Sequence, residues 1–534
     1  MKKELSMKRK PLLLIALLCF AAVLALDLWF LTGPVNNLYD ADSTDTLMWA
    51  EATAAAGQPV NTHYYYASVL PFGAHLLMLP FLGLTGVSLT THIIGMVLFW
   101  LLMAGAALFF FRGLRWTWPE ALFAASALLL LFGSGRQVMG MYFQHVIYYS
   151  LGTLFLLTGM GLLFRVTQSA QEGRRRRALV LSALLGLWMA LTATDGVMSL
   201  SGFCVPCLGA YALERLLDPD WRLRNRQDRR SAWLFAGLFA LMAVGYVAGV
   251  KLTDRTVGGA YGAYHSTFST ADQWGANLLS IPGGWISMWT DEVKQVLMLS
   301  GEGVQSLLGI AFALLFAVIP LAAIPLYRKL ETRMERMVVL AHLLMTLLLC
   351  FACVFGMVGT RFYGMHDTAI LCTLVVLRHG LRHAAPAWKR VSALCVAGVA
   401  LFAATCGVGL ATKYNEQTDD VKRAYGTIDF LRGRGLTYGY ATFWNCNSYT
   451  VLSGGDIKIR PVKDKESWSC YVPDTYQSDQ HWYLEQPGQD RYFVMLADNE
   501  VAASGDHLPE GASEVLTYDR YSIYVYDHFP FSWE

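Results

Sequence analysis

Residues 11–31 read PLLLIALLCFAAVLALDLWFL, and this apolar stretch decides the class of fold. A basic start, here MKKELSMKRK, followed by an apolar run is also the pattern of a signal peptide. The run is longer than the ~7–15 residues of a signal-peptide core, however, and no A-x-A cleavage site follows it. Its length is close to the ~20 residues that cross a bilayer as a helix. We therefore expect a retained membrane helix whose N-terminus lies in the cytoplasm.

The composition of the whole chain also indicates a membrane protein. Of its 534 residues, 55% are hydrophobic and 15% are charged, whereas soluble domains average ~25% charged residues. The apolar residues form continuous blocks. This excludes a disordered chain, a single soluble enzyme and an outer-membrane barrel, whose strands would alternate over ~10 residues. The blocks predict a polytopic α-helical membrane protein with about 11 spans. These spans are 11–31, 88–111, 118–134, 146–166, 178–195, 197–217, 231–252, 304–327, 337–358, 367–379 and 391–412.

The positions of the basic residues indicate which loops face the cytoplasm, where Lys and Arg accumulate. With the N-terminus inside, the cytoplasmic loops are rich in these residues, at 112–115, 174–177, 222–230, 328–336 and 378–390. This alternation requires that the apolar segment 67–86 does not cross the membrane. Its prolines and glycines would break a membrane helix. We expect the segment to pack at the outer membrane surface or to dip into it.

The chain divides into a membrane domain, residues 1–412, and an extracytoplasmic α/β domain, residues 413–534. Two long outer loops belong to the first domain, at 32–87 and 253–303. In the second domain, residues 418–432 have the pattern of a capped amphipathic helix. Strands are expected at 436–443, 456–462, 491–497 and 521–526. Cys446 and Cys470 also lie there, and they are a candidate disulfide in an oxidising compartment.

An acidic cluster follows the first span directly, with Asp40, Asp42 and Asp45 close together. A carboxylate at this position is able to act as a general base on a hydroxyl or to bind a divalent cation. The alternative is structural. Asp42-x-x-Asp45 is also the pattern of a helix N-cap followed by an acidic third residue, opening a helix that runs to Ala56. The residues alone leave both interpretations open.

The order of features in this loop resembles the membrane glycosyltransferases of the GT-C superfamily. These include protein O-mannosyltransferases and lipid A aminoarabinose transferases. In their pattern an acidic pair follows the first span, and then come a short helix, a glycine and a Tyr/Pro-rich segment. Here Asp42 falls near the catalytic position, Gly57 at the helix end, and residues 64–73, YYYASVLPFG, at the Tyr/Pro segment. Ser43 stands where a second acidic residue is expected. We favour Asp42 as the base over Asp40 and Asp45, with Tyr65 as an accessory residue.

A second match is the sequence TRFY at 360–363, at the outer end of the ninth predicted span. It resembles the Arg-Tyr motif that follows a late span in these enzymes. The resemblance implies that Arg361 and Tyr363 bind the donor phosphate. A guanidinium suits this role because it pairs bidentately with phosphate and stays charged. The alternative is that Arg361 reaches lipid headgroups and Tyr363 belongs to an aromatic belt.

Three further residues are accessory candidates. His145 and Asp195 lie at the outer ends of predicted spans, where ionisable groups are costly and often functional. His366 lies close to Arg361 in the sequence. The short outer loop around Arg136 and His145 has no Asp-x-Asp motif and no Glu, which favours an enzyme with no cofactor and no metal over one that uses a divalent cation.

Other chemistries find no support in the sequence. The chain lacks the Walker A, G-x-G-x-x-G and His-Glu-x-x-His motifs. Its run of four arginines at 174–177 indicates contact with anionic membrane lipids rather than with nucleic acid.

Together, the residues and the resemblance predict a GT-C-type glycosyltransferase of the bacterial cytoplasmic membrane. It would move a sugar from a polyprenyl-phosphate donor to a hydroxyl of a lipid, glycan or protein acceptor at the outer face. The alternatives are a transporter or flippase of a lipid-linked saccharide and a non-catalytic membrane scaffold. Transporters usually show internal repeats and broken central helices, and this sequence shows neither clearly.

Overall fold

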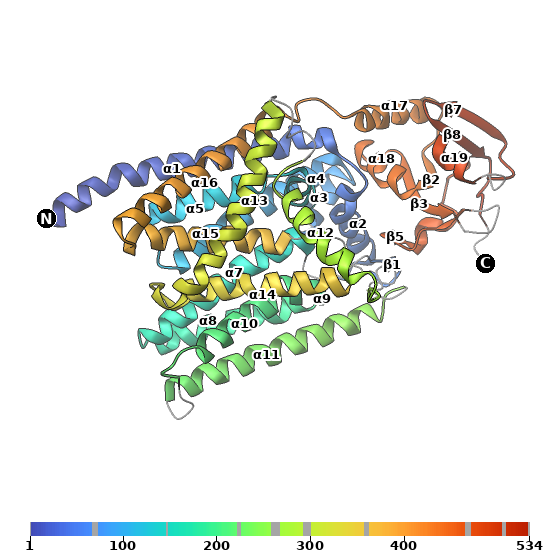
Figure 1. The fold of residues 1–534 in the computed structure, drawn as a ribbon. Helices are drawn as coiled ribbons and strands as arrows, with labels where there is room; N and C mark the ends of the chain where they lie inside the picture. Colours follow the sequence, from blue (N-terminus) through green and yellow to red (C-terminus); the bar gives the residue numbers. More distant parts are fainter. Residues whose placement is uncertain are drawn as a thin grey trace.

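The computed structural model of the protein shows a bundle of long helices with an α/β domain at one end (Figure 1). It describes residues 2–66, 73–145, 148–221, 226–257, 268–291, 301–356, 363–464, 471–504 and 509–531. Within these ranges, nine helices are long and apolar enough to cross a membrane, or ten if one bent pair counts as a single span. We call the end of the bundle that carries the α/β domain the C-domain end.

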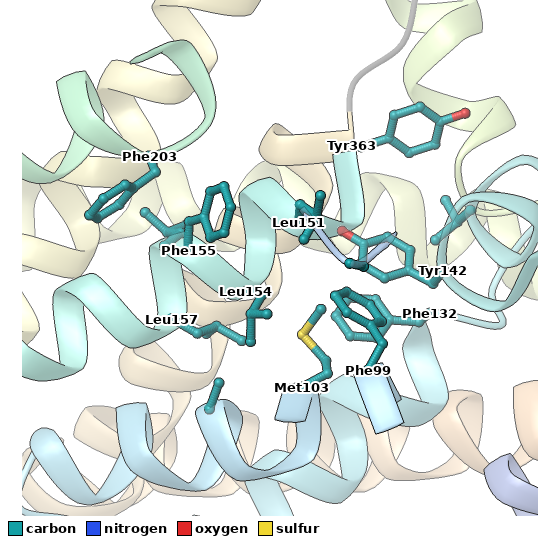
Figure 2. Close-up of a cluster of buried hydrophobic side chains, with 14 of the residues drawn as sticks. Phe99, Met103, Phe132, Tyr142, Leu151, Leu154, Phe155, Leu157, Phe203 and Tyr363 are labelled. Carbon is teal, nitrogen blue, oxygen red and sulfur yellow. The ribbon is translucent and has the colours of Figure 1, made fainter. Parts of the chain in front are cut away.

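The predicted spans correspond to helices of the bundle. They are α1 (Lys2–Thr32), α4 (Leu89–Gly113), α5 (Trp118–Leu131), α7 (Tyr148–Gln171), α8 (Arg175–Ala193), the continuous run α9 (Val197–Ser199), η4 (Leu200–Cys204) and α10 (Val205–Leu216), α11 (Arg226–Thr253), α13 (Gly301–Leu326), α14 (Arg333–Phe355), α15 (Tyr363–His383) and α16 (Pro386–Thr412). Their large apolar side chains pack into one continuous core. Figure 2 shows part of this core, with Phe132 and Tyr142 close together and Tyr363 at its edge.

Helix α15 is longer than the span predicted at 367–379, and it does not count among the apolar helices. It lies against α14, α16 and α13, so most of its side chains are buried in protein rather than exposed to lipid. Polar groups are tolerated there because they find partners. At one end of the helix, for example, Arg378 contacts Glu120 at 3.2 Å and Glu335 at 2.7 Å.

The chain between α5 and the next long helix turns sharply. Helix α5 is followed by α6 (Arg136–Met139) and the π-helical turn η3 (Gly140–Gln144), and the two apolar parts meet at 105°. Gly135 lies at this break. A Cβ atom on Gly135 would lie 3.0 Å from the backbone oxygen of Met288, which follows α12 (Trp274–Ser287). The close approach of the two backbones explains why a glycine occupies this position.

The first outer loop forms a compact layer between the bundle and the α/β domain (Figure 1). It contains η1 (Pro34–Leu38), η2 (Asp42–Thr44), α2 (Asp45–Ala56), β1 (Tyr64–Tyr65) and α3 (His75–Thr85). Helix α2 ends at Gly57, whose φ of 64° is the left-handed conformation that glycine adopts readily. The N-cap interpretation of Asp42 is wrong for α2, because this helix begins at Asp45 and Thr44 occupies its N-cap position.

Helix α3 bears on the prediction that residues 67–86 do not cross the membrane. It has 11 residues and therefore spans roughly 17 Å, well short of the ~30 Å hydrocarbon core. Residues 67–72 of the same segment lie outside the described ranges.

The C-terminal domain contains a six-stranded mixed sheet in the order β4-β3-β2-β6-β8-β7. Strand β2 runs parallel to β3 and β6, and the remaining pairs are antiparallel. The elements are α17 (Asp419–Gly433), β2 (Tyr438–Thr442), η7 (Phe443–Asn445), α18 (Asn447–Leu452), β3 (Lys458–Asp464), β4 (Tyr471–Pro473), β5 (Ser478–Asp479), η8 (Gln480–Tyr483), β6 (Tyr492–Ala497), α19 (Asp498–Ser504), β7 (Glu514–Tyr518) and β8 (Tyr521–Tyr526). The predicted helix and four predicted strands are α17, β2, β3, β6 and β8. The edge strands β4 and β7 were not predicted.

Candidate functional site

A cavity of about 400 Å³ lies at the C-domain end of the bundle. Four separate parts of the chain form its wall: the first outer loop, the α6–η3 turn, the end of α12 with the residues after it, and the start of α15. Its lining residues are Leu38, Asp40, Arg136, Gln137, Gly140, Met141, Gln144, His145, Ser287, Thr290, Asp291 and Tyr363. Three of the residues singled out in the sequence, Asp40, His145 and Tyr363, therefore meet in one place.

The positive charge of the cavity comes from Arg136, at the start of α6. Its side chain is exposed, and among the described residues no carboxylate forms an ion pair with its guanidinium. The backbone N–H of Arg136 donates to Oδ1 of Asp291. The other oxygen of Asp291, Oδ2, accepts from Lys413 Nζ at 3.3 Å. Because Lys413 compensates Asp291, Arg136 remains able to bind an anionic group.

The three aspartates of the first outer loop have different environments. Asp40 is exposed and lines the cavity, and its Oδ1 accepts from Ser43 N at 2.9 Å and Ser43 Oγ at 2.6 Å. Asp42 is partly exposed at the start of η2, and it is not among the lining residues of the cavity.

Asp45 is only 4% exposed. Burial, together with the nearby charge of Asp42, holds the pKa of the Asp45 carboxyl well above its ordinary value of 3.8, although Gln477 acts in the opposite direction. A carboxyl that is buried and retains its proton is poorly suited to accept another.

A buried polar network supports the wall beneath Tyr363. His366 lies one helical turn further along α15, and its Nε2 is 3.3 Å from Ser134 Oγ. The centroid of its ring is 4.3 Å from that of Trp289, with the two rings tilted by 38°. Its Nδ1 lies 3.1 Å from Asp367 Oδ1.

The second oxygen of Asp367 accepts hydrogen bonds from the hydroxyls of Tyr142 and Thr153. The network therefore joins α15 to η3 and α7. His366 and Asp367 do not line the cavity; they connect the helices behind its wall.

The remaining candidates lie elsewhere. Asp195 is buried between α8 and α9 and does not line the cavity. Tyr65 lies in β1, where its hydroxyl accepts from Gln480 Nε2 at 3.3 Å. Arg361 lies outside the described ranges, so its predicted role stays a prediction.

The disulfide between Cys446 and Cys470 also stays a prediction. Cys446 is buried, and its Sγ donates to the Phe443 carbonyl at 3.0 Å, but Cys470 lies outside the described ranges.

Sequence reasoning missed several residues of the cavity. Arg136, Asp291 and Lys413 were not singled out as candidate site residues. The Gly133-Ser134-Gly135 sequence at the end of α5 was a usable signal, because two close glycines at the end of a span indicate a sharp bend. The pairing of Asp291 with Lys413 joins residues far apart in the chain, and no local pattern announces it.

Comparison with solved structures identifies the fold. The chain is similar to ArnT from Cupriavidus metallidurans in the apo state, with a TM-score of 0.54 and 13% identity over 95% of this chain and 97% of that one. The same protein bound to undecaprenyl phosphate gives a TM-score of 0.52 and 14% identity, with the same coverage. An Archaeoglobus fulgidus oligosaccharyltransferase crystallised with zinc and sulfate gives 0.51 and 10% identity, over 90% of this chain and 68% of that one. Neither a protein-family model nor a curated protein matches the chain.

These likenesses confirm the predicted class of fold. The protein has the overall fold of ArnT and of the archaeal oligosaccharyltransferase, with several helices long and apolar enough to cross a membrane and a sheet-containing C-terminal domain. At these identities the comparison concerns the fold, so the chemistry has to be argued from the cavity itself.

Proposed function

We propose that the protein is a membrane glycosyltransferase that moves a sugar from a polyprenyl-phosphate donor to an acceptor hydroxyl. The observation that carries this proposal is the cavity at the C-domain end, where Arg136 is free to bind an anion and Asp40 lies in the same wall. The fold supports the donor class. Similar structures hold undecaprenyl phosphate in ArnT and a dolichol-phosphate in the archaeal oligosaccharyltransferase.

The donor phosphate is assigned to Arg136, with Arg361 and Tyr363 as further contacts. Arg361 precedes the cavity-lining Tyr363 by two positions in the sequence. As the bond between the anomeric carbon and the phosphate oxygen breaks, negative charge collects on the departing phosphate. A guanidinium at that point stabilises the transition state more than the ground state, which is the requirement for catalysis.

The acceptor is activated by an aspartate of the turn at 40–42. The acceptor oxygen attacks the anomeric carbon and forms the new glycosidic bond. Its proton passes to the carboxylate, and the electron pair of the broken bond leaves with polyprenyl phosphate. Two aspartates compete for the role of base. Asp42 matches the position implied by the resemblance, whereas Asp40 lines the cavity but has one oxygen engaged by Ser43. We assign the proton transfer to Asp42 and the support of the turn to Asp40.

The same proposal covers the location and composition of the enzyme. The C-domain end lies on the extracytoplasmic side of a bacterial cytoplasmic membrane, with residues 413–534 as an outer domain. The reaction needs no metal ion or cofactor, because Arg136 and Arg361 supply the positive charge that a cation would supply. The acceptor is a hydroxyl of a lipid, glycan or protein of the cell envelope.

The test is the transfer of radiolabelled sugar from polyprenyl-phosphate donors by the purified protein. We expect Asp42→Asn to lower kcat by roughly 100-fold or more, because general base catalysis contributes ~10²–10⁴-fold. Asp40→Asn should have a smaller effect, and Asp429→Asn, at a side chain that is 76% exposed in α17, serves as the matched control.

A larger loss in Asp40→Asn than in Asp42→Asn would move the base to Asp40. Full turnover in both variants would show that neither Asp40 nor Asp42 takes part in the reaction. Movement of a lipid-linked saccharide without covalent transfer would instead support a transporter.

A further inference from the structure

The first outer loop and the C-terminal domain share a buried ion pair. Glu51 projects from α2, the helix that follows the aspartate turn, and Arg460 projects from β3. Arg460 Nη1 donates to Glu51 Oε2 at 3.2 Å, and Nη2 donates to Oε1 at 2.9 Å, so the pair is bidentate. The Arg460 side chain is 2% exposed, and its guanidinium lies over the Trp482 ring at 3.8 Å.

A second set of contacts lies next to the first, at the neighbouring residue of α2. Asn61 Nδ2 donates to the backbone oxygen of Ala52, in α2, at 3.1 Å and to Asp479 Oδ2 at 2.7 Å. Asp479 belongs to β5, which pairs antiparallel with β1 of the loop. The C-terminal domain therefore completes a small sheet with the first outer loop, and it is connected to the C-terminal half of α2 directly through Glu51 and indirectly through Asn61.

The two ends of the loop also lie close to the domain. Thr418 N, at the start of the domain, donates to the Asn37 carbonyl at 2.9 Å. At the far end of the loop, a Cβ atom on Gly455 would lie 3.5 Å from the Val87 carbonyl oxygen, so the two backbones are near each other. The loop is thus hydrogen-bonded to the domain at its beginning and middle, and it lies beside the domain at its end.

We infer that the Arg460–Glu51 pair is a positioning device, through which the C-terminal domain holds α2 and the aspartate turn in place for sugar transfer. The inference rests on the proposed function, because it takes this turn as part of the reacting site. Arg460 is a positioning residue and touches neither donor nor acceptor. Arginine suits the role because its planar fork fixes both the distance and the orientation of a carboxylate.

The chemistry of the pair determines which substitution is informative. Replacing Arg460 by a small residue leaves a cavity, and removing its charge leaves the partly buried Glu51 carboxylate without a partner. Either change can unfold the interface. Glu51→Gln keeps the size of the side chain and one acceptor oxygen, and it removes only the charge. Arg460→Lys keeps the charge and removes the fork. The matched control is Arg432→Gln, because Arg432 pairs with Asp456 inside the same domain with 50% of its side chain exposed.

The experiment measures hydrogen–deuterium exchange of residues 45–56 alongside sugar transfer, in the full-length protein. For Glu51→Gln we expect faster exchange in α2, unchanged exchange in the central strands β2 and β6, and a fall in kcat on the order of 10-fold or more. Small misplacements of reacting groups have effects of this size. KM for the donor should change much less than kcat. Arg460→Lys should fall between the wild type and Glu51→Gln, and Arg432→Gln should behave as the wild type.

The two readouts separate this inference from the proposed function. Unchanged exchange in α2, with normal transfer by the wild type, overturns the positioning device and leaves the proposed function standing. Faster exchange with unchanged kcat shows that the pair stabilises the loop without serving the reaction, and this also overturns the inference. A wild-type protein that transfers no sugar, while Glu51→Gln still loosens α2, overturns the proposed function and retains the attachment of the loop to the domain.

Discussion

Arg136 has an exposed guanidinium in the cavity wall and, within the described ranges, no ion-pair partner. We predict that Arg136→Gln lowers kcat/KM for the lipid-phosphate donor by roughly 10- to 100-fold, since a hydrogen bond to a charged group contributes ~1.5–3 kcal/mol. Transfer rates at several donor concentrations provide the measurement. Arg255→Gln, at an exposed arginine that does not line the cavity, is the control. An equal effect of the two substitutions would show that only the overall charge matters.

Asp45 leads to a prediction about pH. Its pKa is raised in the folded protein, so the protonated form is favoured there. The stability that it contributes is complete below its ordinary pKa of 3.8 and is lost as the pH rises through the raised pKa. Asp45→Asn imitates the protonated acid, and the decline of the melting temperature as the pH rises above 3.8 should be shallower in this variant. Identical slopes in the two proteins would contradict a buried, protonated Asp45.

At the residue scale, the sequence identified part of the cavity. Asp40 was named because it belongs to the acidic cluster after the first span, and His145 because it is an ionisable residue at the end of a span. Tyr363 was named because it belongs to the sequence that resembles an Arg-Tyr motif. Asp291 and Lys413 were not, because each is an ordinary polar residue in an outer segment. Their importance comes from a contact between the end of α16 and the residues after α12. Tertiary contacts of this kind are not visible in a single sequence.

At the scale of elements, the break between α5 and α6 places six lining positions between Arg136 and His145 in the cavity wall, because it turns η3 back toward the first outer loop. Gly135→Ala should therefore disturb the cavity from a distance. The added Cβ would lie 3.0 Å from the Met288 backbone oxygen, and overpacking of this kind costs ~1–3 kcal/mol. We expect a lower melting temperature and a raised donor KM.

The control for this substitution is Gly105→Ala, inside α4, where a Cβ atom would have no neighbour within 4 Å. This variant should melt at or slightly above the wild-type temperature, because alanine favours the helix over glycine. A Gly135→Ala protein that behaves like Gly105→Ala would show that the backbone approach at the break is not essential.

Long apolar helices were the most predictable elements, because a lipid environment demands continuous hydrophobicity over a fixed length. Helix α15 was predicted too short because it is not surrounded by lipid and therefore needs no continuous apolar sequence. It is enclosed by other helices, so His366, Asp367 and Arg378 replace apolar residues at its ends. The edge strands β4 and β7 escaped prediction because they lack the continuous apolar run of a central strand such as β6, which is buried at every position.

At the scale of the whole molecule, the proposed orientation places the C-terminal domain outside the cytoplasm. The test uses a membrane-impermeant maleimide on intact cells. A cysteine introduced as Asp429→Cys, in α17, should be labelled, and one introduced as Arg175→Cys, at the start of α8, should be labelled only after lysis. The unsubstituted protein measures labelling of its own cysteines. The reverse pattern would invert the topology and move the cavity to the cytoplasmic face.

Lys413 lies at the junction where α16 ends and the chain leaves for the C-terminal domain, and it neutralises Asp291 beside the cavity. A protein truncated after Thr412 would therefore lose more than a covering domain. With Lys413 gone, the two negative charges of Asp291 and Asp40 would exceed the single positive charge of Arg136. The cavity would then repel the anionic donor that it is proposed to attract. The two halves of this chain are thus electrostatically inseparable, and exchanging its outer domain for that of another protein would succeed only if the graft brought its own cation to this position.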